Sequence, residues 1–86
     1  MKPGDCGKLV LNSPGYGLFA YVPHTTNDYK QGIPATFQLE RNQTFTIISL
    51  IHDEQNTSGF GNDWAFIIVD GTTKTGWIQA HYVKRM

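Results

Sequence analysis

The feature that most constrains this chain is the short spacing between its turn-forming residues. Gly, Pro, Asn, Asp, Ser and Thr cluster at intervals, and the stretches between these clusters are short and rich in β-branched and aromatic side chains. This pattern is typical of β-strands joined by turns. Apolar residues keep helical spacing nowhere for more than two turns. The sequence therefore predicts an all-β fold.

The strands are expected where these apolar stretches lie. The clearest hairpin signal is a stretch at 64–69, followed by the turn pair Asp70-Gly71 and a return stretch at 75–78. Two polar stretches without periodicity, 24–35 and 52–63, are expected to be long loops. Such a chain suits a small barrel or two packed orthogonal sheets. The remaining strands are expected at 8–11, at 17–22, as one or two strands within 37–51, and at 82–83.

Length and charge limit the classes of partner. A chain of 86 residues is long enough for one domain and one core. Its seven basic and seven acidic residues cancel, whereas binding nucleic acid or an anionic membrane surface needs a basic surplus. No apolar run approaches the roughly 20 residues that cross a bilayer. We therefore expect neither a nucleic-acid partner nor membrane insertion. The lone Cys6 forms no intrachain disulfide, which fits a reducing, cytoplasmic compartment.

Four short motifs occur in an order that resembles the Src-homology-3 (SH3) family. Residues 17–21, Gly-Leu-Phe-Ala-Tyr, resemble the opening Ala-Leu-Tyr-Asp-Tyr, and residues 37–43 resemble Leu-Ser-Phe followed by a diverging turn. Residues 62–64, Asn-Asp-Trp, resemble Asp-Gly-Trp-Trp, and residues 76–83 resemble Gly-Leu-Phe-Pro-Ser-Asn-Tyr-Val. The ending also resembles that of bacterial SH3-like domains. The resemblance implies an SH3-like barrel of five to six short strands with two long loops over 17–86, and residues 1–16 are an extension or an extra strand.

The resemblance implies a peptide-binding face made of four aromatic residues, Phe19, Tyr21, Trp64 and Tyr82. A polyproline II ligand is preformed and apolar, so flat rings separated by slots accommodate it at low entropic cost. A Trp ring also offers its indole N–H to a ligand carbonyl. If Leu18 faces the core, alternation along the strand places Phe19 and Tyr21 on the outer face. The alternative is that these rings pack in the core or close the barrel.

Several positions depart from the family pattern. Gln79 stands where the family usually keeps a proline that lines the groove, and Ala65 replaces the second tryptophan. We therefore expect weak or atypical peptide recognition, with Gln79 in the groove. In the family, loop acids beside the groove pair with a basic residue of the ligand. Glu54 and Asp63 are the candidates for this role because their loop flanks Trp64, and the alternative is that they are solvated loop residues.

The stretch at 66–69 is apolar at every position, so its two faces cannot be assigned from sequence. A strand that is apolar on both faces indicates that its outer side is covered, either by the N-terminal extension or by a partner. In the next strand, Ile78 is expected in the core and Trp77 partly exposed.

Catalytic and metal sites are not expected. The three histidines, His24, His52 and His81, are far apart and show no zinc-site spacing. No glycine-rich segment connects a strand to a helix, and no nucleophile has a recognisable base nearby in sequence. We expect a binding module for an extended, proline-containing peptide, without enzyme activity, cofactor or metal. The alternatives are a bacterial-type domain that binds cell-wall peptide, and a structural or subunit-interface domain in which Ile67, Val69 and the long loops meet a partner.

Overall fold

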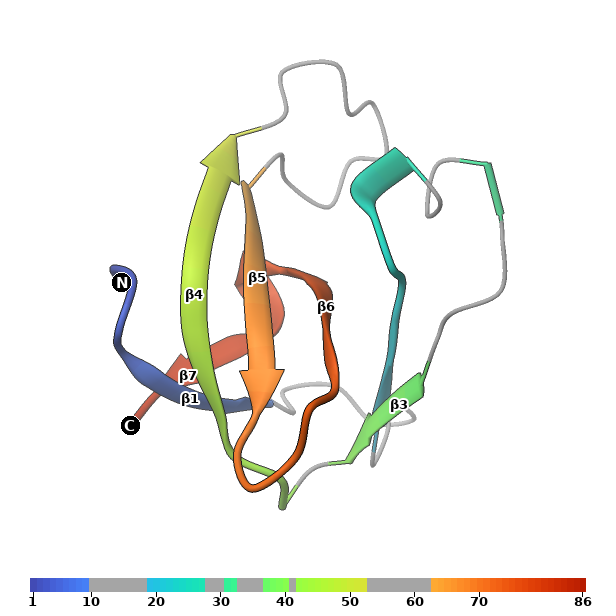
Figure 1. Ribbon diagram of the computed structural model, residues 1–86. Helices are drawn as coiled ribbons and strands as arrows, with labels where there is room; N and C mark the ends of the chain where they lie inside the picture. Colours follow the sequence, from blue (N-terminus) through green and yellow to red (C-terminus); the bar gives the residue numbers. More distant parts are fainter. Residues whose placement is uncertain (10–18, 28–30, 33–36, 41, 53–62) are drawn as a thin grey trace.

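The computed structural model describes residues 1–9, 19–27, 31–32, 37–40, 42–52 and 63–86, with the backbone alone at 19–21 (Figure 1). Its regular elements are seven strands and one short 3₁₀ helix, and Thr26 and Asn27 are also helical, so the prediction of a fold built from strands is confirmed for the described part of the chain. They are β1 (Cys6–Leu9), β2 (Phe19–Val22), β3 (Phe37–Glu40), β4 (Phe45–His52), β5 (Asp63–Val69), β6 (Thr75–Gln79), η1 (Ala80–Tyr82) and β7 (Val83–Arg85).

The described strands form two antiparallel sheets. The larger one has the order β6-β5-β4-β1-β7, and the smaller one pairs β2 with β3. Figure 1 shows β4, β5 and β6 side by side, with β2 and β3 to one side of them. Within the first sixteen residues, Cys6–Leu9 form a strand between β4 and β7, and Leu9 is buried.

The predicted hairpin joins β5 to β6. The backbone N–H of Val69 donates to the carbonyl of Lys74 at 2.9 Å, which closes the hairpin. Gly71 in the turn has a φ of +76°, a conformation that favours glycine. The Asp70 carboxylate accepts hydrogen bonds from the hydroxyls of Thr44 at 2.8 Å and Thr46 at 2.9 Å. The turn is therefore bound to the start of β4 as well as closed by its own backbone.

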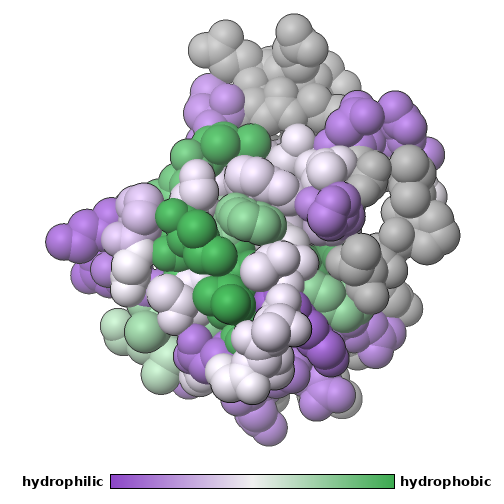
Figure 2. Space-filling view, viewed as in Figure 1, coloured by the Kyte–Doolittle hydropathy of each residue, from purple (hydrophilic) through white to green (hydrophobic). Residues whose placement is uncertain are grey.

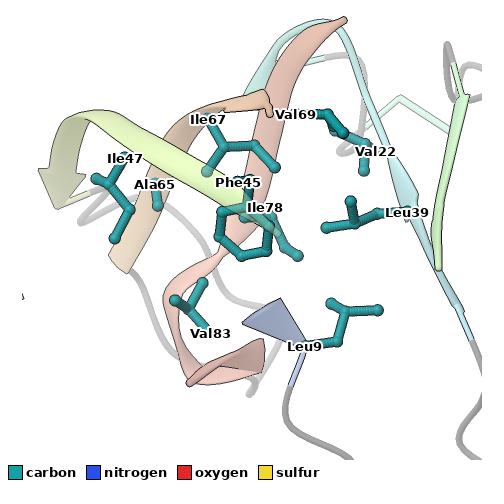
Figure 3. Packing of buried hydrophobic residues seen from close by; sticks show 10 residues of the cluster. All are labelled: Leu9, Val22, Leu39, Phe45, Ile47, Ala65, Ile67, Val69, Ile78 and Val83. Carbon is teal, nitrogen blue, oxygen red and sulfur yellow. The ribbon is translucent and has the colours of Figure 1, made fainter. Parts of the chain in front are cut away.

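The hydrophobic core lies between the two sheets. Figure 3 shows Val22 and Leu39, from β2 and β3, on one side of the cluster, and side chains of β4, β5 and β6 opposite them. On β5 the core residues are Ala65, Ile67 and Val69, which places Phe66 and Ile68 on the outer face. The remaining core members are Leu9, Phe45, Ile47, Ile78 and Val83.

The hypothesis of a subunit interface formed by Ile67 and Val69 is wrong for these two residues, because both are buried. Both side chains are almost completely buried in the core, so neither is available to a partner. A partner on the outer face would meet the alternate residues of β5, Phe66 and Ile68, which are half-buried. The expectation for β6 is confirmed, since Ile78 is buried and Trp77 is half-buried.

The two sheets approach each other closely where β6 passes the end of β2. The backbone N–H of Trp77 donates to the carbonyl of Pro23 at 3.0 Å. A Cβ atom added at Gly76 would lie 2.5 Å from Val22 Cγ1 and 2.9 Å from the Pro23 carbonyl oxygen. Glycine is therefore required at this position for the backbones to come so close.

Candidate functional site

Two residues of the predicted groove, Trp64 and Gln79, lie directly opposite each other on β5 and β6. Hydrogen-bonded and non-hydrogen-bonded pairs alternate along an antiparallel ladder. Because Val69 and Lys74 are joined by a ladder hydrogen bond, the alternation makes Trp64 and Gln79 a non-hydrogen-bonded pair. Side chains of such a pair are close neighbours on one face of the sheet. The start of β5 and the end of β6 therefore bring the tryptophan and the glutamine together.

Both side chains of this pair are buried. Trp64 is 1% exposed and Gln79 is 4% exposed. Neither belongs to the hydrophobic core cluster, since Ala65 and Ile78, their neighbours along the strands, point into it. Trp64 therefore does not form an exposed ridge in this conformation. The pair is a buried patch on the side of the sheet away from the core.

The amide of Gln79 is the unusual polar group of this patch. Its Nε2 atom is buried and has no hydrogen-bond partner among the described residues. A buried donor without a partner costs about 1–3 kcal/mol, and native proteins keep few of them. The backbone of Gln79 is extended, with φ −62° and ψ 132°. This φ is the one that proline adopts.

Tyr82 lies near the pair through η1, which begins at the residue after Gln79. Its side chain is half-buried and packs against the core cluster. Its ring centroid lies 4.1 Å from that of His81. The short helix therefore follows directly on the Trp64–Gln79 end of β6, while the Tyr82 side chain packs against the core cluster.

Asp63, the loop acid predicted to meet a basic ligand residue, is hydrogen-bonded within the protein. Its Oδ1 atom lies 2.6 Å from Nδ1 of His52, and the two residues are paired across β4 and β5. Both side chains are largely exposed. They form the polar side of an open hollow of about 390 Å³, whose other lining residues in the described part of the chain are Met1, Leu50, Ile51 and Ala80. Sequence reasoning missed this pairing, although both residues stand at the ends of strands that a long hairpin would place opposite each other.

The other predicted site residues are described in part or not at all. Phe19 and Tyr21 lie in β2, where the backbone pairs with Glu40 and Gln38, but their side chains are outside the described part of the structure. Glu54 falls at 53–62, outside the described residues. Of the seven candidates, the structure thus pairs Trp64 with Gln79, with Asp63 preceding Trp64 on β5 and Tyr82 in the helix after Gln79.

An apolar surface covers the outer face of the large sheet. Ile48 and Ile51 are 45% and 37% exposed. Phe66 and Trp77 are half-buried, with ring centroids 4.9 Å apart. Figure 2 shows hydrophobic residues gathered in the middle of this face, over β4 and β5. We call this surface, formed by Ile48, Ile51, Phe66, Ile68 and Trp77, the outer patch.

The exposure of Ile48 follows from an irregularity in β4. The β4–β5 register shifts between Ile47 and Ser49, as in a β-bulge, so Ile48 is the additional residue. Ile47 therefore stays in the core while the adjacent isoleucine lies exposed. Sequence reasoning inferred an apolar outer side from β5 alone and missed the contribution of β4.

Metal-ligating side chains do not gather in the described ranges, where no group of three or more His, Cys, Asp or Glu residues comes together. Over the same residues, no helix has the length and apolar character to span a membrane.

Comparisons of the chain with models of protein families, with curated proteins and with solved structures found no significant match. Membership of the SH3 family therefore stays a prediction from the motifs.

Proposed function

We propose that this chain is an SH3-like binding module that holds an extended, proline-containing peptide at the Trp64–Gln79 end of the large sheet. The observation that carries the proposal is the pairing of Trp64 and Gln79, which belong to two different motifs, across β5 and β6, with Tyr82 in the short helix that follows Gln79. An aromatic ring beside an amide donor offers a flat apolar surface and a polar anchor, which together suit a polyproline II segment.

The burial of Trp64 determines how such a ligand would bind. At 1% exposure the ring is inaccessible, so a peptide reaches it only after the groups that cover it move aside. The free energy of that opening is subtracted from the binding free energy, because the affinity scales with the fraction of molecules in the open state. We therefore expect weak binding, with dissociation constants in the high micromolar to millimolar range.

The test is a titration of isotope-labelled protein with a pool of proline-rich peptides, followed by amide and indole chemical shifts. The expected result is that the Trp64 indole N–H and the amides of Gln79 and Tyr82 move together in a saturable way. The amide of Lys8 in β1, which is separated from β5 by β4 in the sheet order, serves as the internal control. If millimolar peptide leaves the Trp64, Gln79 and Tyr82 signals unmoved, the groove proposal is wrong.

A second candidate function, an interface with a second copy of the chain, is favoured by the outer patch. Its five residues are uncharged, and the chain has a formal net charge of zero. Two copies facing each other across a twofold axis would therefore bury apolar side chains without opposing like charges. Exposed apolar surface of this kind often marks an interaction site.

Sedimentation at increasing protein concentration tests the second candidate. We expect a reversible monomer–dimer equilibrium that the substitution Ile48→Lys shifts toward the monomer, since it would place a charge in the interface. Thr73→Lys, at an exposed turn position outside the patch, is the matched control. A wild-type chain that stays monomeric at high micromolar concentration would exclude this interface.

A further inference from the structure

We propose that the side-chain amide of Gln79 is a specificity-determining hydrogen-bond donor, which binds a main-chain carbonyl of the peptide beside the Trp64 ring. This inference rests on the proposed function and names the ligand group that the site selects. Where the SH3 family usually keeps the apolar ring of a proline, this chain would present the side-chain N–H groups of Gln79 to the ligand. The preferred ligand is therefore an extended peptide with an accessible carbonyl at the position next to the indole.

The first argument is the state of the Gln79 amide. Nε2 is buried and has no acceptor among the described residues, and Gln79 as a whole is only 4% exposed. A primary amide has two N–H donors, and leaving them without acceptors is costly. An apolar residue of similar size would avoid this cost. A ligand acceptor gives the amide a role that folding alone does not.

The second argument is the chemistry of the expected ligand. A polyproline II segment has no internal hydrogen bonds, so its carbonyl groups are available to an external donor. Proline has no backbone N–H, and a proline-rich segment is therefore rich in acceptors and poor in donors. A protein donor such as the Gln79 amide is complementary to that surface. A side chain that offers only an acceptor at this position would not be complementary to the ligand carbonyl groups.

The third argument is that the backbone at Gln79 suits proline as well as glutamine. Its φ of −62° fits the proline ring. Because Trp64 and Gln79 form a non-hydrogen-bonded pair, the Gln79 backbone N–H points away from β5. Losing this N–H would not break the β5–β6 ladder. The backbone conformation at position 79 therefore does not require glutamine instead of proline. The two residues differ at this position in their side chains, since only glutamine has a side-chain hydrogen-bond donor.

The experiment compares wild-type protein with Gln79→Met and Gln79→Pro, using the peptide of the proline-rich pool that moves the Trp64 signals most. Methionine keeps a flexible side chain of similar length and removes the donor. We expect about a 5- to 10-fold increase in Kd for both variants, the loss typical of one hydrogen bond. We expect the melting temperature of Gln79→Met to be unchanged or raised, because a buried donor without a partner is removed.

The outcomes separate this inference from the function on which it rests. If Gln79→Met and Gln79→Pro bind the peptide as tightly as wild type, the donor role is wrong and the binding function stands. If wild type binds no peptide of the pool, both are wrong.

A measurement on the wild-type protein decides the question if a variant fails to fold. Addition of peptide should move the Gln79 side-chain NH₂ protons downfield, as expected when an amide gains an acceptor. A saturated complex in which those protons do not move overturns the donor role. A downfield shift that saturates with the Trp64 indole signal supports it.

Discussion

Replacing Gly76 by alanine tests the closest approach between the two sheets. The new Cβ would lie 2.5 Å from Val22 Cγ1 and 2.9 Å from the Pro23 carbonyl oxygen, and Phe37 Cε1 would be 3.6 Å away. The first two distances are too short for non-bonded atoms. Val22 is fully buried and its side chain is β-branched, so it has no open space into which to rotate. The Pro23 oxygen belongs to the backbone, so β2 itself must move.

The expected magnitude follows from three contributions. Overpacking of a buried site costs about 1–3 kcal/mol. Displacement of Pro23 weakens its 3.0 Å hydrogen bond from Trp77 N–H, which costs a further 0.5–1.5 kcal/mol or so. The lower entropy of the unfolded alanine chain returns about 0.4–1 kcal/mol. We expect Gly76→Ala to lower the free energy of unfolding by about 2–3 kcal/mol. For a chain of 86 residues, whose total stability is of the order of 4–13 kcal/mol, this is a large fraction.

The assay is equilibrium urea unfolding of Gly76→Ala, Val22→Ala and the double variant. Removing Val22 Cγ1 relieves the shortest contact, so the double variant should be at least 1 kcal/mol more stable than the sum of the single effects predicts. Gly71→Ala is the control, because it has a φ of +76° but no atom within 4 Å of its added Cβ. Its cost of about 1–2 kcal/mol should be independent of Val22. Additive effects of Gly76→Ala and Val22→Ala would refute the proposed contact.

Three further substitutions test other parts of the structure by urea unfolding. Phe45→Ala should lower the free energy of unfolding by about 3–5 kcal/mol, because it leaves a cavity among fully buried neighbours. Ile48→Ala should change the free energy of unfolding by less than about 1 kcal/mol, because the Ile48 side chain is exposed. A double-mutant cycle between Phe66 and Trp77 should give a coupling of about 0.5–1.5 kcal/mol from their ring contact, and a value near zero would argue against that contact. Asp70→Ala should cost about 1–2 kcal/mol and Asp70→Asn less, because the amide keeps one acceptor oxygen for the two threonine hydroxyls; equal costs would show that the retained oxygen contributes nothing to stability.

Local sequence signals predicted the strands well because turn chemistry and β-branched stretches act over a few residues. The hairpin around Asp70-Gly71 is the clearest case, since its turn needs a residue at positive φ and the flanking stretches are apolar. The faces of β5 were not predictable, because every residue from 66 to 69 is apolar and either register would bury apolar side chains. They are decided by non-local packing of Ile67 and Val69 against β4 and the smaller sheet.

The predicted hairpin accounts for the pairing of Trp64 with Gln79 but not for the burial of the two side chains. The motifs predicted that Trp64, Gln79 and Tyr82 share a groove; strand pairing places Trp64 opposite Gln79, and Tyr82 follows three residues later in η1. Trp64 is paired with Ile51 and Gln79, which are 13 and 15 residues away in the sequence, so its surroundings are not encoded by a local pattern. The same holds for Ile48, whose exposure results from the register shift in β4. Turn residues and apolar periodicity predict where a strand lies. The exposure of its side chains depends on which other residues pack over the strand.

The two candidate functions are linked by the position of the outer patch. Ile51 is paired with Trp64 across β4 and β5, and Trp77 is two residues from Gln79 on the same face of β6. A second copy seated on the patch would therefore lie beside the place where a peptide carbonyl meets Gln79. Groups that must move to uncover Trp64 would have less room in such a dimer. Peptide binding and self-association are thus expected to compete, and a peptide that binds at Trp64 should shift any monomer–dimer equilibrium toward the monomer.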